Sequence, residues 1–452
     1  MKYLIYMLGI LLGAGSMWFL LYAGRSAALI LVCLVATAAT AGTMNPALFR
    51  INEWIYYGII GAITIVVSYR LLTKPSKTLL GKSWRILTTT ERVTLLILFI
   101  LMFCSTLVSM ISARPAAGSA FIVFSAFVAL TESWYSACRR KGNKVQTIQP
   151  LILINTYMIV AGLLASWLSP RQGDNGQLLN SSGALAMFSA AVLGGAFVFG
   201  GQRRQLRFIG VVVGSMALLG LVIQHSDKSS IIVGALLSWI VIAISSRLRL
   251  HSVNMHIKRQ RVLPTIMAII IILTCITPPV VTNVLYSRSL QSEKIAGFVS
   301  WIVAKSGESE LNLFDRPNRW SALLVYVTAH PINLLLTNFE DIAYEQLPGI
   351  WKSAQPHNVL IAFGVWWGWA GLAIVVLAIY LFFRRAAFCV LYAEKRDQVV
   401  ALWSIGVTSG LFFRNMWSIG VLSFPLETFI FASAVCLIAL LDTHRPRHVL
   451  TL

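Results

Sequence analysis

Long apolar segments alternate with short polar ones along almost the whole chain. Thirteen segments are apolar over roughly the length that crosses a bilayer as a helix. They lie at 3–22, 27–44, 51–68, 93–112, 117–138, 148–168, 183–200, 208–224, 230–246, 262–284, 358–383, 398–416 and 420–440. None shows the period-two alternation of an outer-membrane barrel. Because backbone groups inside a bilayer must be hydrogen-bonded within the protein, the pattern predicts helices.

The apolar segments predict an all-α polytopic membrane protein with a bundle of about 12–13 transmembrane helices. The lower number applies if the segments 3–22 and 27–44 form a single interrupted helix. We expect residues 1–452 to form a single transmembrane domain. Its one long extramembrane segment is 285–357, which we expect to be a periplasmic loop. Apolar residues in this loop, such as Trp320, Leu323 and Leu324, have a spacing typical of short helices.

The composition agrees with the apolar pattern. Hydrophobic residues make up 57% of the chain, charged residues only 12%, and the mean hydropathy is +0.76. A soluble domain carries about twice that charged fraction, so the composition excludes a soluble globular enzyme. The six cysteines show no spacing typical of a disulfide framework or a zinc site.

The net charge of +21 is concentrated in short segments between the apolar runs. This is a topology signal rather than a surface for nucleic acid, since basic loops resist transfer across a membrane. The most basic segments together hold 24 of the 37 Lys and Arg residues, and they are 69–92, 139–147, 201–207, 247–261, 384–397 and 441–452. We expect these segments to face the cytoplasm. Two or three spans precede 69–92, so the side of the N-terminus stays open.

The opposite side then holds several cations at the ends of spans. The segments expected there are 113–116, 169–182, 225–229, 285–357 and 414–419, and their candidate residues include Arg171, Lys228, Arg316 and Arg319. A single Arg at a helix end is most often an anchor in the headgroup region. A set of cations on the outer side also suits a polyanion such as a diphosphate, because the Arg fork matches phosphate oxygens.

His357 begins the span that follows the long loop. An imidazole can accept a proton near neutral pH. Most histidines at a membrane interface are only amphipathic anchors, and we interpret His225 and His330 in this way. His357 differs because it stands where the long loop returns to the bundle, and we expect a cleft between loop and membrane at that point.

Four motifs occur in a characteristic order over about 171–371. The motif residues are Arg171, Gly173 and Asn180, then Ser226, Lys228 and Ser229, then Arg316, Trp320, His330 and Pro331, and finally His357, Asn358, Leu360, Gly368 and Gly371. In this order the chain resembles the O-antigen ligase and polymerase superfamily. Two positions depart from the family's pattern: Lys228 stands where an Arg is usual, and Ala322 is one residue off its common position after the Trp.

The resemblance implies transfer of a glycan from an undecaprenyl-diphosphate carrier to an acceptor hydroxyl, at the periplasmic face of a bacterial inner membrane. It makes Arg171, Lys228 and Arg316 the diphosphate-binding residues and His357 the catalytic residue. Arg319, Asn358 and Asn180 are secondary candidates. The expected partners are the lipid-linked donor, the lipid A-core acceptor and membrane lipids, and we expect inversion at the sugar carbon without a metal or another cofactor.

Two other functions remain open on the sequence. An O-antigen polymerase would join lipid-linked repeats with the same donor chemistry, but we favour a ligase because the long outer loop and basic outer rim can hold a phosphorylated lipid A-core. A transporter or lipid flippase would place ionisable groups near the bilayer midplane. Glu132 and Glu427 lie in or near spans, but the cations gather at the outer ends.

Overall fold

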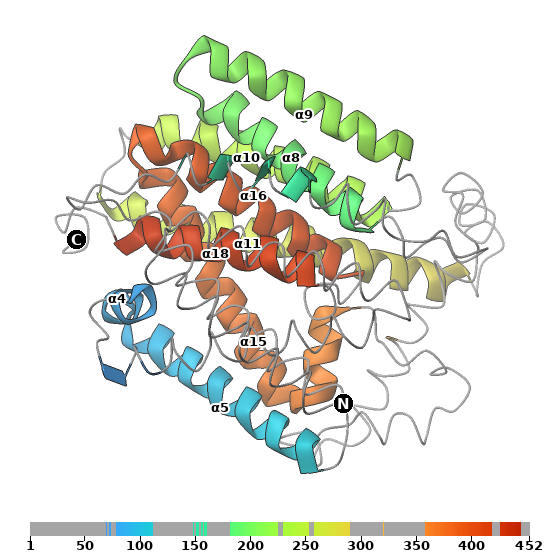
Figure 1. The fold of residues 1–452 in the computed structure, drawn as a ribbon. Coiled ribbons are helices and arrows are strands. Elements are labelled where there is room, and N and C mark those ends of the chain that lie inside the picture. The colour runs from blue at the N-terminus through green and yellow to red at the C-terminus, as the bar shows by residue number, and fades with distance from the viewer. Residues whose placement is uncertain are drawn as a thin grey trace, which may run out of the picture.

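The chain folds into a bundle of long helices (Figure 1). The computed structural model describes residues 69, 72–73, 78–111, 148, 151–152, 155–156, 158–160, 181–224, 229–252, 257–289, 320, 358–417 and 425–443. The helices are α4 (Leu79–Ile86), α5 (Thr89–Ile111), α8 (Ser181–Gly200), α9 (Arg204–Gln224), α10 (Ser229–Ser252), α11 (Ile257–Ser289), α15 (Val359–Tyr392), the 3-10 helix η3 (Lys395–Asp397), α16 (Gln398–Asn415) and α18 (Pro425–Thr443). These residues contain no β-strand, which confirms the all-α prediction for this part of the chain.

Four of these helices contain segments long and apolar enough to cross a membrane. The segments are Gly183–Gly200, Arg204–Ile223, Ser230–Arg249 and Trp367–Tyr392. They confirm the prediction of a membrane protein, while the total of 12–13 spans stays a prediction. The predicted long loop lies outside the described residues except at its start and at Trp320. Its start needs correction, because α11 continues to Ser289 and makes the first residues of 285–357 helical.

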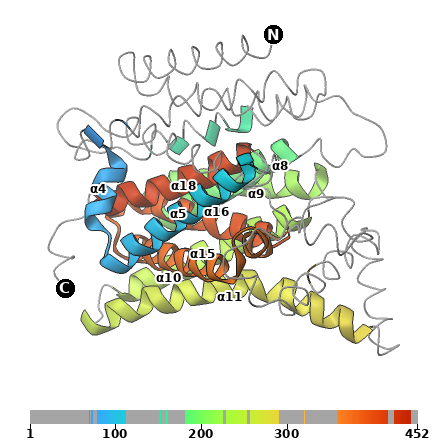
Figure 2. The ribbon, with the colours of Figure 1, turned by 90° about the horizontal axis from the view of Figure 1, so that it is seen from below.

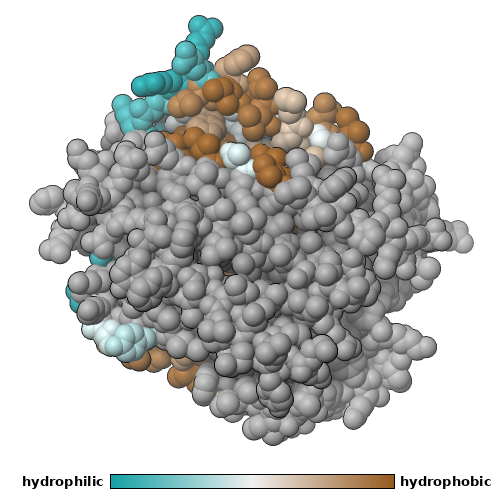
Figure 3. All heavy atoms as spheres, in the orientation of Figure 1, coloured by the Kyte–Doolittle hydropathy of each residue, from teal (hydrophilic) through white to brown (hydrophobic). Residues whose placement is uncertain are grey.

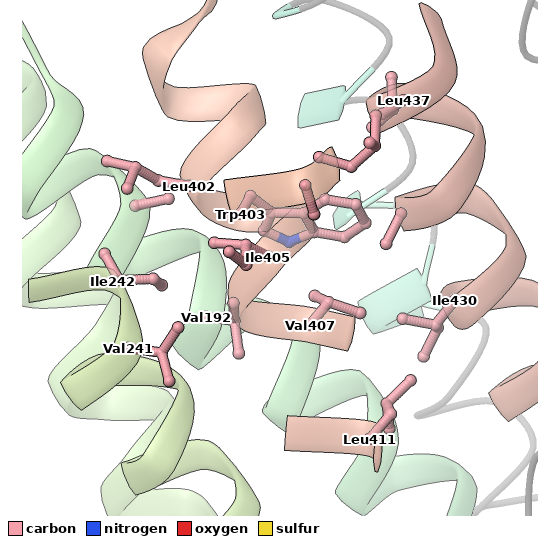
Figure 4. Close-up of a cluster of buried hydrophobic side chains, with 14 of the residues drawn as sticks. Val192, Val241, Ile242, Leu402, Trp403, Ile405, Val407, Leu411, Ile430 and Leu437 are labelled. Atoms are coloured by element: carbon pink, nitrogen blue, oxygen red, sulfur yellow. The ribbon is translucent and has the colours of Figure 1, made fainter. Parts of the chain in front are cut away.

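Helix α16 forms the centre of the bundle. All its residues from Val399 to Asn415 are buried, as expected for a helix that is apolar on every side. Side chains of α8 and α10 pack on one side of it, and those of α18 pack on the other (Figure 4). The cluster in Figure 4 includes Val192, Ile242, Trp403 and Leu437. Helix α11 lies along the face formed by α15 and α16 (Figure 2).

Small residues allow α10 and α16 to pack closely. A Cβ added to Gly410 would lie 2.7 Å from the backbone oxygen of Gly234 and 2.3 Å from Ser238 Oγ. The Ser238 hydroxyl donates to the carbonyl oxygen of Gly406 at 2.7 Å. Close backbone approach through Gly and Ser is a common way for helices to pack in a membrane, where apolar surfaces alone give little preference for protein over lipid.

Helix α9 lies at the edge of the bundle and packs mainly on α8. Its outward face is apolar and exposed, including Phe208, Met216 and Ile223. Figure 3 shows this apolar surface over α9, next to a hydrophilic region at one end of the helix. An exposed apolar surface of this size needs an apolar neighbour. A lipid bilayer provides one, in agreement with the hydropathy of α9.

An ion-pair cluster joins four helices at one end of the bundle. Arg385 Nε lies 2.5 Å from Asp442 Oδ2, and Arg385 Nη1 lies 2.8 Å from Glu91 Oε2. Arg385 Nη2 also donates to the carbonyl oxygen of Ile86, the last residue of α4. We call Arg385, Glu91 and Asp442 the Arg385 cluster. Its contacts bring parts of the basic segments 69–92, 384–397 and 441–452 to one end, as the Lys and Arg distribution predicts.

Helix α15 is broken at Gly368, where the sequence predicts one continuous span over 358–383. Gly368 has φ 66° and ψ −171°, a combination that is essentially restricted to glycine. The helical parts before and after this residue therefore run in different directions (Figure 1). The apolar pattern predicts the helix but not the break, because both parts are equally apolar.

We expect Gly368→Ala to destabilise the protein by about 1–3 kcal/mol, because alanine would be strained in this conformation. The measurement is the thermal unfolding midpoint of the purified protein in detergent. Gly364→Ala is the matched control in the same helix, where the added Cβ would meet only Leu372, at 3.6 Å or more. Equal midpoints for the two variants would contradict the strained conformation at Gly368.

Candidate functional site

The C-terminal end of α16 forms a tight turn opposite the end that holds the Arg385 cluster. The Met416 N–H donates to the carbonyl oxygens of Phe412 and Phe413, and the Trp417 N–H donates to that of Arg414 at 2.9 Å. We call residues Arg414–Trp417 the α16 turn. These bonds satisfy carbonyl oxygens in the last turn of the helix. The Met416 carbonyl oxygen lies after them in the chain and accepts a hydrogen bond from another element.

That other element is α15, which begins at the α16 turn. The Asn358 side chain accepts from the backbone N–H groups of Leu360 and Ile361 at 3.0 and 3.2 Å, and so caps the helix. Its Nδ2 donates to the Met416 carbonyl oxygen at 2.9 Å. Asn358 is buried, with 6% of its surface exposed. One side chain therefore fixes both the first turn of α15 and its distance from α16.

Trp320 is a second motif residue at the α16 turn. Its ring centroid lies 5.6 Å from that of Trp417, with the rings tilted at 54°. Trp320 is only 3% exposed. Aromatic pairs at such distances contribute about 0.5–1.5 kcal/mol beyond the burial of their surface. Trp320 and Asn358 come from different motifs. Trp320 contacts Trp417 and Asn358 contacts Met416, and these two residues are adjacent in the α16 turn.

A buried ion pair supports the α16 turn from the side of α18. The Glu427 carboxylate accepts from Arg414 Nη1 through Oε2 and from Asn415 Nδ2 through Oε1, the latter at 2.7 Å. Asn415 Nδ2 also donates to the Leu411 carbonyl oxygen at 2.7 Å. Glu427 is fully buried and Arg414 is 5% exposed. Removing one partner of such a pair typically costs about 3–5 kcal/mol, because it leaves a buried charge without compensation.

Of the predicted site residues, the structure describes Asn358, and it places this residue at the α16 turn. The other predicted site residues lie outside the described residues, and they are His357, Arg171, Lys228, Arg316, Arg319 and Asn180. Two of them are close in sequence to the turn's contacts: His357 directly precedes Asn358, and Arg316 precedes Trp320 by four positions. The roles of these six residues stay predictions.

The sequence predicts no role for Arg414 or Asn415, and for Glu427 it indicates only a possible ion-coupling role. A signal was present, because Arg414 begins the predicted outer segment 414–419 and Glu427 lies eight residues after its end, in the next apolar run. Ionisable residues in spans usually have a partner or a function. The segment is short, which favours packing of the two spans against each other. The pairing of the two charges depends on how α16 and α18 pack.

An apolar groove of about 540 Å³ runs along α15 after the break at Gly368. It is lined by Trp369, Leu372, Ala373, Val376, Leu377 and Tyr380. With almost entirely apolar walls, such a surface suits a hydrocarbon chain rather than a polar substrate group. Within the ranges that the structure describes, no group of three His, Cys, Asp or Glu side chains is arranged to hold a metal ion.

No family model, curated protein or solved structure matches the chain.

Proposed function

We propose that the protein is a glycosyltransferase that moves an O-antigen glycan from undecaprenyl diphosphate to the lipid A-core oligosaccharide. We assign it to the bacterial inner membrane, with the α16 turn toward the periplasm and the Arg385 cluster toward the cytoplasm. The observation that supports this proposal is the meeting of Trp320 and Asn358 at the α16 turn. These residues come from two separate motifs of the superfamily that the sequence resembles.

In the proposed reaction, an acceptor hydroxyl oxygen attacks the sugar carbon that is bonded to the diphosphate. The new glycosidic C–O bond forms as the C–O bond to the diphosphate breaks, and the diphosphate leaves with the bonding electron pair. Arg171, Lys228 and Arg316 stabilise its growing negative charge. His357 accepts the hydroxyl proton. A single displacement of this kind inverts the sugar carbon, and it requires no cofactor.

Asn358 has a supporting role in this mechanism. Its side chain is used for the α15 cap and for the bond to the Met416 carbonyl, so it orients the chain next to His357 rather than the acceptor. Arg319 and Asn180 are secondary candidates for contacts to the donor. The apolar groove on α15 offers a surface of suitable chemistry for part of the polyprenyl chain.

An O-antigen polymerase is the second candidate, because it uses the same donor and the same leaving group. Transport is supported less well. Glu427, which could have coupled transport to an ion, already accepts hydrogen bonds from Arg414 and Asn415 in a fully buried position. Such a carboxylate is poorly suited to bind and release an ion in a transport cycle.

The test is the surface lipopolysaccharide of a strain that lacks this gene. For a ligase we expect lipopolysaccharide without O-antigen, together with polymer that accumulates on its lipid carrier. For a polymerase we expect lipopolysaccharide capped with a single repeat. The control is the same strain complemented with the wild-type gene. Unchanged, fully capped lipopolysaccharide in the deletion strain would contradict both transferase functions.

A further inference from the structure

The α16 turn holds two segments that are far apart in the sequence. Asn358 binds the carbonyl oxygen of Met416, and Trp320 packs on the ring of Trp417. These contacts fall on two consecutive residues of the turn. A shift of the turn therefore displaces both the start of α15 and Trp320.

The position of the turn depends on a carboxylate from another helix. Glu427 lies in the first turn of α18 and uses both of its oxygens, one for Arg414 and one for Asn415. Asn415 uses its amide nitrogen for both Glu427 and the carbonyl oxygen of Leu411. The last turn of α16 is thus held both to its own helix and to α18.

We propose that Glu427, Arg414 and Asn415 are positioning residues for the transfer reaction. They hold the α16 turn, and the turn contacts Asn358, which directly follows His357 in the chain, and Trp320, which follows Arg316 by four positions. This inference rests on the proposed function and extends it to three residues outside the motifs of the superfamily. The three act through the turn, because each is at most 5% exposed and both Arg414 and Asn415 donate to Glu427.

The Arg385 cluster offers a matched comparison within the same protein. It also joins an Arg to carboxylates from neighbouring helices, Glu91 and Asp442, and Asp442 belongs to α18 as Glu427 does. It lies at the opposite end of the bundle from the α16 turn. If both clusters only stabilise the fold, their loss should lower activity solely through the amount of folded protein.

The first experiment measures transfer kinetics with purified protein in liposomes, a lipid-linked glycan donor and a lipid A-core acceptor. We expect Glu427→Gln to lower kcat by about 10- to 100-fold, with the KM for the donor changed less than about threefold, since small displacements of reacting groups can cost this much. The amide of Gln has only one acceptor oxygen, so one of the two donors loses its partner. Arg385→Gln should lower the unfolding midpoint but keep kcat per folded molecule within about threefold.

A second variant separates positioning from folding. The double variant Arg414→Met and Glu427→Leu replaces the ion pair with apolar side chains of similar size, a change that is often neutral or stabilising. We expect an unfolding midpoint close to that of the wild type and a kcat as low as that of Glu427→Gln. A normal kcat in the double variant would overturn the proposal and leave the ion pair a purely structural role.

Hydrogen exchange tests the same positioning without any substrate. The amide N–H groups of Leu360 and Ile361 are held by Asn358, so they should exchange faster in the double variant and at the wild-type rate in Arg385→Gln. Unchanged exchange at these amides would overturn the proposed link from Glu427 to Asn358. A wild-type protein without transfer activity would instead contradict the proposed function, and the two failures are therefore distinct.

Discussion

Replacing His357 with alanine should lower glycan transfer by about 100- to 10,000-fold, the usual contribution of a general base. Binding of the lipid-linked donor should persist, because in the proposed mechanism the cations and not the imidazole hold the diphosphate. The measurement is transfer by purified protein in liposomes, with donor binding measured in parallel on the same preparation. A lower kcat with unchanged donor binding would indicate that His357 acts on the acceptor hydroxyl.

His225→Ala is the matched control, because His225 is interpreted as an interface anchor and is not one of the motif residues. It should transfer glycan at close to the wild-type rate. If His357→Ala also transfers at that rate, or if its donor binding falls in proportion to its activity, the role of His357 on the acceptor side is wrong. His357→Gln is a useful companion, since an amide can orient a hydroxyl but does not accept its proton at neutral pH.

Replacing Arg316 or Arg171 with alanine should lower the transfer rate at least roughly tenfold. A hydrogen bond between charged groups contributes about 1.5–3 kcal/mol, and about 1.4 kcal/mol corresponds to a factor of ten in rate. Unlike the His357 variant, these variants should also bind the donor more weakly. The measurements are the KM and kcat for the donor, with folded protein quantified for each variant.

Arg319→Ala is the internal control for the diphosphate site, and we expect a smaller loss than for Arg316→Ala. Lys228→Arg gives a further comparison, because the planar fork of Arg can bind two phosphate oxygens where Lys offers a single charge. Full activity in both Arg171→Ala and Arg316→Ala would exclude a diphosphate site formed by these residues.

The neighbouring residues Arg384 and Arg385 show why a count of charges in loops does not give the roles of individual residues. In the sequence, Arg384 and Arg385 are equal topology signals. In the structure Arg384 is exposed, whereas Arg385 binds Glu91 and Asp442 between helices. Adjacent residues on a helix point in different directions, so only one of the two can face the bundle. The number of Lys and Arg residues in a loop predicts the end of the bundle at which that loop lies. The direction in which each side chain leaves its helix decides which residue it contacts.

The sequence by itself predicted the long helices of the described residues, but only some of their bounds: the predicted span 358–383 continues to Tyr392, and 262–284 is part of Ile257–Ser289. The predicted spans 183–200 and 398–416 correspond to Ser181–Gly200 and Gln398–Asn415, within two residues at each end. The physical reason is local: an apolar run in a bilayer must satisfy its backbone groups internally, and a helix does so wherever its neighbours lie. The distribution of Lys and Arg likewise indicated which segments share an end, because charge resists transfer across the membrane.

Only the tertiary structure decided which side chains meet. The break at Gly368 lies inside one apolar run, and the pairing of Glu427 with Arg414 depends on how α16 and α18 pack. The contacts of Asn358 and Trp320 with the α16 turn join residues from separate segments. An apolar run carries little information about its neighbours, because every apolar face can pack against lipid or against another helix. The polar contacts that specify the arrangement are few, and their partners are distant in the sequence.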